Sequence, residues 1–368
     1  MKPKEHRRPA SRTAVVQGTV SGIFGAACGF VMVSRLPDLG VGPLPSLAIP
    51  LGLLGLGLWL QTVLHELGHL VFGLVSGYRF LSFRVGRVLL LREKGKLRLR
   101  RYSLAGTSGQ CLMLPPEGDP ETIPVRLYNL GGVMMNALWG ALGVLGAAIS
   151  PQPVVQSGLS LFAASGFLMA LLNGIPLRGT VDNDGYNLRA ARACGASRRA
   201  IWVQLQVAGA MAQGLRLREM PEEWFRWPEE TDLSNSLCAA AAVYCYSRLL
   251  DEHRLEECRE RITALLDHAP GLTPLFRACL AGDRMFLELL RGDPAAVQAL
   301  DTQETRRILR AMKDNPSVLR TEYARACLER RDQAEAAKLL ARFDRAAARW
   351  PYAGDIASER ELLALASQ

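Results

Sequence analysis

Two histidines and a glutamate stand close together in 58-LWLQTVLHELGHLVFGLVSGY-78, a segment that is otherwise almost entirely apolar. Its centre reads HELGH, from His65 to His69. On an α-helix, histidines four residues apart lie on one face. Both imidazoles can then bind one Zn²⁺ ion, while Glu66 acts as general base for a bound water. Zinc lowers the pKa of that water to about 7 and polarises a carbonyl group. The pattern therefore predicts a hydrolytic zinc centre.

The surroundings of the motif favour a metal site over a surface cluster. An H-E-x-x-H pattern also arises by chance on soluble helices, where a solvated His-Glu-His cluster is the simpler interpretation. Here the motif lies in a run apolar enough for lipid, where a charged group costs at least ~2.5–3.5 kcal/mol. Glu66 is the only acidic residue within the apolar runs described below. A zinc ion that takes up both imidazoles offsets this cost.

A catalytic zinc site needs a third protein ligand and an open position. The candidates lie in 173-NGIPLRGTVDNDGYNL-188, where a proline and a glycine break the helix and the chain can return to the site in extended form. Asp182 and Asp184 are the only carboxylates there. We expect Asp184 to be the ligand, because Gly185 lets the backbone turn sharply beside the metal. Asp182 is the alternative.

Apolar runs long enough to span a bilayer occupy the first half of the chain of 368 residues, and charged residues dominate from about 188 onward. Four transmembrane spans are predicted, near 13–34, 50–77, 127–150 and 157–176. The net charge is +9. Its Arg and Lys residues crowd at the ends of the apolar runs, which is typical of membrane topology. No nucleic-acid-binding motif accompanies them, so nucleic acid is excluded as a partner.

The positive-inside rule orients these spans. The basic tail 1–12, the basic segment 79–101 and the Arg-rich segment 189–200 all fall on one side. We therefore expect a multi-pass protein of the cell membrane, in a bacterium, with both termini cytoplasmic. Pro50 should mark the start of the second span. Short alternating segments around 93-EKGK-96 predict a β-hairpin within 79–103, followed by a loop over 104–127.

The remainder, 189–368, is predicted to be a cytosolic helical domain. Two stretches, 236–270 and 317–351, each combine a small-residue helix with a charged one and end in proline. Their length of about 34 residues resembles tetratricopeptide repeats, with an ordinary helical bundle as the alternative. The fold class is thus an all-α polytopic membrane protein with a small membrane-associated β-hairpin, plus a cytosolic repeat-like domain that could bind a protein partner.

Taken together, residues 13–188 resemble the site-2 protease family of intramembrane zinc metallopeptidases. Three features coincide in the family's order: HELGH in the second span, 131-GGVMMN-136 in the third, and Asn173-x-x-Pro176 followed by Asp-Gly after the fourth. The basic hairpin is similar to the family's membrane-associated β segment. The resemblance implies zinc ligands, a catalytic base and two asparagines that position substrate or water: His65, His69 and Asp184; Glu66; Asn136 and Asn173.

Two departures from the family pattern are present. Gly132 stands where the family usually has proline, and Asp184 follows Asn173 by eleven residues where eight is usual. The choice between Asp182 and Asp184 therefore stays open at this point.

The expected function is an endopeptidase that cleaves a transmembrane or signal-peptide segment of a membrane protein. That segment would unwind beside the hairpin, because helical amides are hydrogen-bonded and shielded in lipid. The alternative is a non-catalytic membrane scaffold that recruits a cytosolic partner through its helical repeats. Glu66 argues against a scaffold, since a purely structural zinc site needs no base.

Overall fold

The computed structural model describes residues 43–102, 107–227 and 231–367, together with 18–19, 22–26 and 29. The predicted first span, 13–34, lies mostly outside these residues. The chain divides into two compact units. The first comprises Met1–Phe72 and Arg126–Asn187, and the second comprises Gly73–Val125 and Leu188–Gln368.

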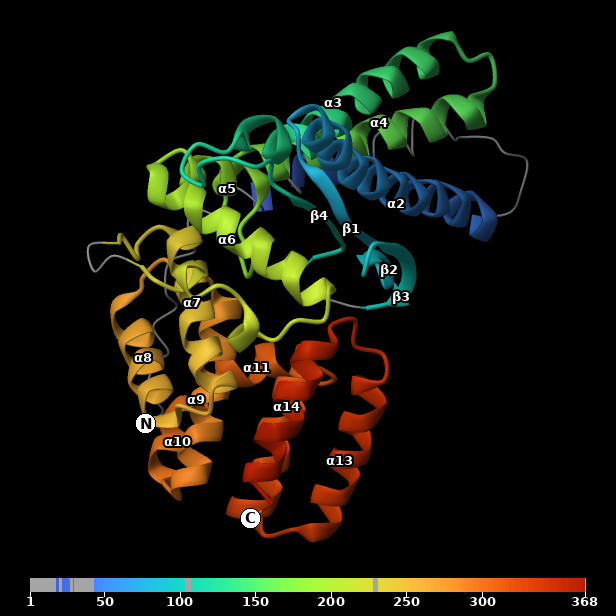
Figure 1. Cartoon of the computed structure of the whole chain (residues 1–368). Helices are drawn as coiled ribbons and strands as arrows, with labels where there is room; N and C mark the ends of the chain where they lie inside the picture. The colour runs from blue at the N-terminus through green and yellow to red at the C-terminus, as the bar shows by residue number, and fades with distance from the viewer. Residues whose placement is uncertain are drawn as a thin grey trace, which may run out of the picture. The chain divides into compact units, whose positions relative to one another are not determined.

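Three long apolar helices dominate the first unit (Figure 1): α2 (Pro43–Val75), α3 (Val125–Ile149) and α4 (Pro153–Gly174). By length and composition each could cross a membrane, α2 through its part Ala48–Val75. They correspond to three of the four predicted spans, with ends displaced by a few residues. The short helix α5 (Asp184–Ala191) follows α4 after an irregular loop.

The start of α2 was predicted wrongly, because Pro50 lies inside the helix instead of at its beginning. A proline within a helix removes one backbone hydrogen bond and crowds the preceding turn. Long apolar helices tolerate this, because neighbouring helices and small local adjustments satisfy the freed carbonyl. Here the helix continues for seven residues before the proline.

Glycines allow the three helices to approach closely. A Cβ atom on Gly57 of α2 would lie 3.3 Å from the Cα of Phe162 in α4, and one on Gly143 of α3 would lie 3.1 Å from the Cβ of Ala163. Small residues at such crossings are typical of helix packing in membranes. Large apolar side chains on the outside, such as Leu145 at 59% exposure, suit a lipid environment.

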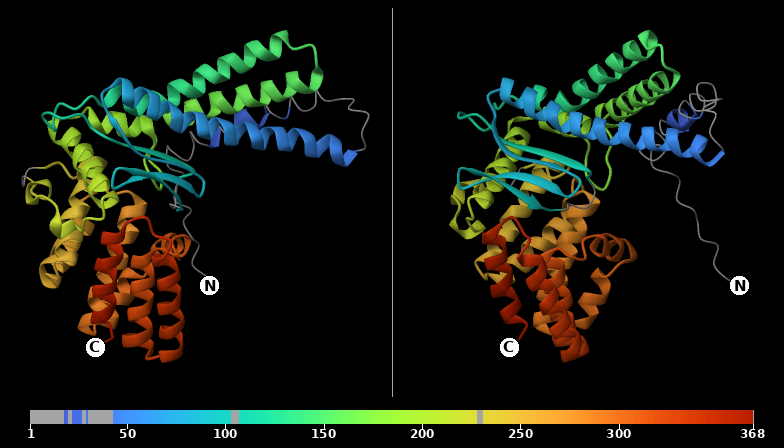
Figure 2. Two further views of the ribbon diagram at one scale, coloured as in Figure 1. Left: turned by 45° about the vertical axis from the view of Figure 1, so that its right-hand side comes forward. Right: turned by 90° about the vertical axis from the view of Figure 1, so that its right-hand side faces the viewer.

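An antiparallel sheet in the second unit has the strand order β3-β2-β1-β4 (Figure 2). Its strands are β1 (Arg79–Val85), β2 (Val88–Glu93), β3 (Lys96–Arg101) and β4 (Gly109–Leu114). The predicted hairpin is confirmed as β2–β3, whose two-residue turn has positive φ at both Lys94 and Gly95, as tight hairpin turns require.

The predicted loop over 104–127 is wrong in part, because it contains β4. This strand pairs with β1, with Val85 opposite Gly109 and Arg79 opposite Leu114. Pairing between segments so far apart in sequence leaves little local signal. One face of the sheet buries Leu81, Leu89 and Leu91 against Ala212, the last residue of helix α6 (Gly195–Ala212).

Helices make up the rest of the second unit. They are α6 (Gly195–Ala212), η1 (Leu217–Glu219), η2 (Glu222–Trp224), α7 (Ser236–Asp251), α8 (Leu255–His268), α9 (Pro274–Arg291), α10 (Pro294–Leu300), α11 (Gln303–Ala311), α12 (Pro316–Ala324), η3 (Arg325–Arg330), α13 (Gln333–Ala347) and α14 (Ala353–Leu365). The stretch 236–270 forms the helix pair α7 and α8, and 317–351 forms α12, η3 and α13.

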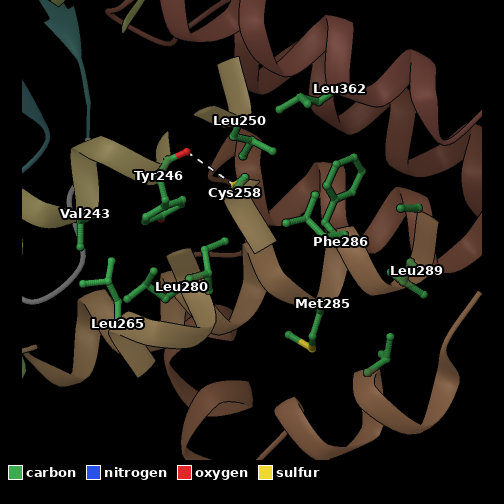
Figure 3. Packing of buried hydrophobic residues seen from close by; sticks show 14 of the residues in the cluster. Val243, Tyr246, Leu250, Cys258, Leu265, Leu280, Met285, Phe286, Leu289 and Leu362 are labelled. Atoms are coloured by element: carbon green, nitrogen blue, oxygen red, sulfur yellow. Dashed lines mark hydrogen bonds between the residues drawn. The ribbon is translucent and has the colours of Figure 1, made fainter. Parts of the chain in front are cut away.

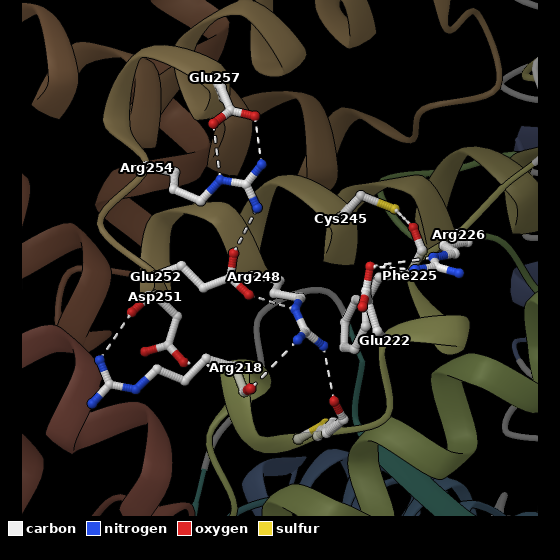
Figure 4. A network of polar contacts seen from close by, with 11 residues as sticks. Arg218, Glu222, Phe225, Arg226, Cys245, Arg248, Asp251, Glu252, Arg254 and Glu257 are labelled. Carbon is white, nitrogen blue, oxygen red and sulfur yellow. Dashed lines mark hydrogen bonds and ion pairs between the residues drawn. The ribbon is translucent and has the colours of Figure 1, made fainter.

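A large apolar core joins α7, α8 and α9 to α14 (Figure 3). Phe286 at its centre is fully buried, and Tyr246 and Leu362 pack into the same cluster. Beside this core, charged side chains secure the segment between α6 and α7 (Figure 4). Arg248 donates to the carbonyl of Met220 at 2.8 Å and to Glu252 at 2.7 Å.

Candidate metal centre

Helix α2 places the two histidines of HELGH on one face, as predicted from their spacing. The two Nε2 atoms of His65 and His69 lie 3.2 Å apart. Both residues are buried, with exposures of 6% and 8%. Two imidazole nitrogens this close need a proton or a cation between them, because their lone pairs would otherwise repel each other.

A carboxylate completes this group. The Oδ2 atom of Asp184 lies 3.0 Å from Nε2 of His65 and 3.4 Å from Nε2 of His69. An ion held tetrahedrally at 2.0–2.1 Å, as zinc is, spaces its donor atoms about 3.3–3.4 Å apart. The three donors therefore fit one ion of that size, and this His65–His69–Asp184 group could hold a metal. The Asp184 side chain is 20% exposed, so the group is most open on that side.

Hydrogen bonds on the far side of each imidazole set the tautomers. Nδ1 of His69 lies 2.7 Å from the carbonyl oxygen of Tyr128. A carbonyl can only accept, so Nδ1 of His69 carries the proton and Nε2 presents its lone pair. Nδ1 of His65 lies 2.7 Å from Oδ1 of Asn136 in the same manner. This is the arrangement that orients histidine ligands around metals in general.

The orientation of the Asn136 amide follows from its other contacts. Its Nδ2 donates to the backbone oxygen of Gln61 at 2.8 Å and to Oε1 of the same glutamine at 2.8 Å. Nε2 of Gln61 donates in turn to the carbonyl of Phe162 at 3.2 Å. Since backbone oxygens only accept, both amides have one permitted orientation, and Oδ1 of Asn136 must face His65. Three helices are thereby connected by one buried polar chain.

Gln61 and Asn136 are both fully buried. The side chain of Asn136 contacts the ligand candidate His65, and its expected role in positioning substrate or water stays a prediction. Gln61 was not singled out from the sequence, although a signal was present: a polar residue in an apolar span, four positions before His65 and so on the same helical face. Its partner Asn136 in α3 is 75 positions away, so the contact between the two side chains leaves no local sequence signal.

Asn183 holds Asp184 in place. The sequence analysis did not identify this residue either. Its Nδ2 donates to the carbonyls of Leu172 at 2.6 Å and Ile175 at 2.7 Å, at the end of α4. Its Oδ1 accepts from the backbone N–H of Leu177 at 3.1 Å and of Tyr186 at 2.9 Å. All four hydrogen-bonding positions of the amide are used. One side chain thus ties the end of α4 to the first turn of α5, where Asp184 lies.

Glycines make room for the histidines. A Cβ on Gly68, inside the HELGH motif, would collide with the backbone of Gly131 in α3. A Cβ on Gly132 would lie 2.6 Å from both Nδ1 and Nε2 of His65. The glycine pair therefore lets α2 and α3 touch and leaves space for one imidazole.

Gly185 is needed for a different reason from the one expected. Its φ is not positive, so no sharp turn requires it. A Cβ at this position would instead collide with the carbonyl of Gly174 and lie 3.0 Å from that of Asn173. The absence of a side chain lets the start of α5 rest against the end of α4.

The remaining predicted residues lie as follows. Glu66, next to His65 on α2, is buried at 6% exposure. Asp182 is outside the metal group, and its Oδ1 is 3.9 Å from Nε of Arg178. The structure thus brings Asp184, and not Asp182, to the histidines. Asn173 donates to the carbonyl of Met169 at 3.0 Å, and its expected role in positioning substrate stays a prediction.

The charges around Asp184 favour the ionised form of its carboxylate. Burial alone would raise the pKa of Asp184. When both imidazoles are fully protonated and no metal is bound, His69 and His65 donate to the carboxylate from Nε2 and hold its pKa well below its usual range. The donor set thus comprises two nitrogens and one anionic oxygen, the combination found at zinc centres with an open fourth position.

Compared with protein-family models, with curated proteins and with solved structures, the chain gives no match in any of the three.

Proposed function

We propose that this chain is an intramembrane zinc metalloendopeptidase that cleaves a transmembrane or signal-peptide segment of a membrane protein. His65, His69 and Asp184 would hold the zinc ion, and Glu66 would be the general base. The observation that carries the proposal is the convergence of three donor atoms within 3.4 Å of one another in a unit built from three membrane-length helices. The resemblance to site-2 proteases supports the same assignment.

The chemistry divides between the ion and the protein. When bound, zinc would polarise a carbonyl group and make water nucleophilic at neutral pH. Glu66 would take a proton from the attacking water and pass it to the leaving amine. Glu66 is buried next to His65 on α2, which shields it from bulk solvent. Asn136 and the Tyr128 carbonyl would keep both imidazoles in the metal-binding tautomer.

The finer topology is part of this proposal. Residues 13–34 would supply a fourth span, which places both termini in the cytoplasm of a bacterial cell and gives the multi-pass topology favoured by the basic segments. The helix pairs after residue 188 would form a repeat-like domain for a cytosolic protein partner. The repeat-like domain is supported by the helices that the stretches 236–270 and 317–351 both form in succession.

The test measures zinc content and cleavage together. Wild type and Glu66→Gln are purified in detergent and offered a panel of transmembrane and signal-peptide segments. We expect stoichiometric zinc in both proteins and cleavage by wild type alone. Zinc in both without cleavage by either would favour the scaffold alternative. A wild type that takes up no stoichiometric zinc after metal reconstitution would overturn the proposal.

A further inference from the structure

A second cluster of reactive side chains lies outside the metal centre, where helices α6 and α7 begin. Cys194 is the residue before α6, and its Sγ lies 3.1 Å from Oγ of Ser197 in the first turn of that helix. Sγ of Cys238, in the first turn of α7, approaches the same hydroxyl oxygen at 4.0 Å. Two thiols from separate helices therefore share one neighbour.

The two cysteines differ in their access to solvent. Among the cysteines of the described part of the chain, Cys194 alone is exposed. Cys238 is buried at 1% exposure, and this burial raises the pKa of its thiol to about 11 despite the opposing effect of Ser197. An oxidant in solution can therefore reach Cys194, while Cys238 stays a protonated thiol beside it. An accessible cysteine next to a second, resolving cysteine is the usual arrangement of a redox-sensitive pair.

The distance between the two sulfurs is short enough for a disulfide to form. Both sulfurs contact Oγ of Ser197, so they lie no further apart than the sum of these two distances, about 7 Å. A rotation between staggered χ1 positions moves a cysteine sulfur by about 3 Å. Rotations at both residues can therefore close most of this gap, and the starts of the two helices need to shift only slightly.

The hydroxyl between the thiols belongs to a buried hydrogen-bond network. Ser197 is fully buried, and its Oγ accepts from Nδ2 of Asn235 at 2.9 Å. The same Nδ2 donates to the carbonyl of Ala190 at 2.9 Å, and Oδ1 of Asn235 caps α7 by accepting from the N–H of Leu237 at 3.0 Å. Because these contacts fix where α6 and α7 begin, the two thiols are held beside each other in the folded protein.

We propose that Cys194 and Cys238 form a reversible disulfide when the protein meets a hydroperoxide. The sulfur of Cys194 attacks one peroxide oxygen, so that the O–O bond breaks and an S–O bond forms; with hydrogen peroxide the products are a sulfenic acid and water. The sulfur of Cys238 then displaces the hydroxyl group, which leaves as water with the proton of the Cys238 thiol. The peroxide is reduced by two electrons, and the two thiols are oxidised to one disulfide.

A dithiol reductant reverses the reaction by thiol–disulfide exchange. The pair thus responds to the balance between hydroperoxides and cellular thiols, and such transient disulfides are the kind found in reducing compartments. The inference is independent of the metal centre and of the proposed peptidase activity.

The experiment uses the full chain, reduced and purified in detergent at low protein concentration. Hydrogen peroxide is added, the remaining thiols are blocked with N-ethylmaleimide, and linked peptides are identified by mass spectrometry after digestion. We expect one intramolecular link, between Cys194 and Cys238, which dithiothreitol removes. The proposal would be overturned by a protein in which neither thiol reacts, or in which Cys194 is oxidised to a sulfinic acid or linked elsewhere while Cys238 stays reduced.

Single substitutions separate the two roles. In Cys194→Ser, Cys238 should lose its free thiol about tenfold more slowly than in wild type, because the buried sulfur no longer has a reacting partner. Since Cys194 is exposed, the fold should tolerate this substitution. In Cys238→Ser, the sulfenic acid at Cys194 should persist long enough to be trapped by dimedone.

The matched control is Cys245→Ser, which removes a partly buried thiol that donates to the carbonyl of Phe225 at 3.0 Å. This variant should form the link between Cys194 and Cys238 at the wild-type rate. Oxidation of Cys238 at equal rates in wild type and Cys194→Ser would overturn the proposal, because the buried thiol would then react without its exposed neighbour.

Discussion

The side-chain oxygen of Asn136 lies 2.7 Å from Nδ1 of His65, while Nε2 of the same ring lies 3.0 Å from Asp184. One imidazole thus connects a buried amide on α3 to a carboxylate at the start of α5. Because Nδ1 must carry the proton in this arrangement, Asn136 determines which nitrogen of His65 is free to bind a metal.

Replacing Asn136 with alanine should weaken zinc binding by about 10–100-fold without removing any ligand. The free energy of unfolding should also fall, because both hydrogen bonds to Gln61 are lost and that amide stays buried. Chelator competition on the purified protein measures the affinity. Asn173→Ala is the control, since Asn173 bonds only to its own helix among the contacts described, and it should retain wild-type affinity. Equal affinity in both variants would refute this role.

The two candidate carboxylates can be separated by conservative substitution. Asp184→Asn replaces an anionic oxygen 3.0 Å from Nε2 of His65 with a neutral amide, and the purified protein should lose stoichiometric zinc. Asp182→Asn should keep it, because Asp182 lies beside Arg178 and outside the metal group. Metal analysis by mass spectrometry after dialysis distinguishes them. The reverse pattern would make Asp182 the ligand.

A single methyl group at Gly132 should disturb the centre. The Cβ atom of Gly132→Ala would lie 2.6 Å from two ring nitrogens of His65, so the imidazole must move. Overpacking of this kind costs about 1–3 kcal/mol and would here fall on a ligand. We expect weaker zinc binding and a lower melting temperature in detergent. Gly55→Ala in α2 is the control, because no atom from elsewhere in the described part of the chain lies within 4 Å of its Cβ position. A Gly132→Ala protein with wild-type affinity would contradict this expectation.

The parts of the fold that the sequence predicted are those with local signals. Continuous apolar runs identify α2, α3 and α4, and the spacing of HELGH places two imidazoles on one face whatever the tertiary structure. The hairpin turn at Lys94-Gly95 is likewise a local preference. The start of α2 was predicted wrongly at Pro50, because a proline often begins a helix. A long apolar helix can also contain a proline in its interior.

The supporting interactions were not predictable in this way. Asn136 could be associated with the site through a motif, but its contacts with His65 and Gln61 depend on how α2 crosses α3. Strand β4 escaped prediction because its partner, β1, precedes two other strands in the chain. In each case the decisive contact joins residues far apart in sequence, and a pattern of residue types does not report distance in space.

Asn183 should be important for stability as well as for the site. Asn183→Ala removes four hydrogen bonds between α4, the following loop and α5, at a cost of about 2–4 kcal/mol. Asn183→Asp should cost less, because its carboxylate still accepts from Leu177 and Tyr186. Thermal unfolding in detergent should rank the melting temperatures as wild type, then Asn183→Asp, then Asn183→Ala. The zinc content of the three proteins should decrease in the same order. Equal melting temperatures for wild type and Asn183→Ala would rule out this bracing role.

The last prediction concerns a buried carboxylate in the helical part of the second unit. Glu359 on α14 lies 3.1 Å from the guanidinium of Arg320, which also pairs with Asp283. Burial raises the pKa of Glu359 from 4.5 to about 7; Arg320 lowers it, but Asp283 and Asp355 raise it further. Two acids facing one buried arginine thus favour a protonated Glu359 in the folded state.

The sign of the pH dependence follows. Because the folded-state pKa is above the unfolded one, the folded protein binds more protons between pH 4.5 and about 7. The free energy of unfolding should therefore decrease as pH rises through this window, by about 2–3 kcal/mol from Glu359. Glu359→Gln should flatten most of this slope. A smaller part should remain from Asp355, whose pKa burial raises to about 6.

Urea unfolding followed by circular dichroism at pH 5 and pH 8 measures this slope in detergent. Glu304→Gln is the matched control, because Glu304 is an exposed glutamate on α11 and its removal should leave the slope unchanged. The comparison uses slopes and not absolute stabilities, since a glutamine at 359 also pairs less well with Arg320. A slope in Glu359→Gln as steep as in wild type would show that this carboxylate is ionised throughout, with Arg320 dominating over burial.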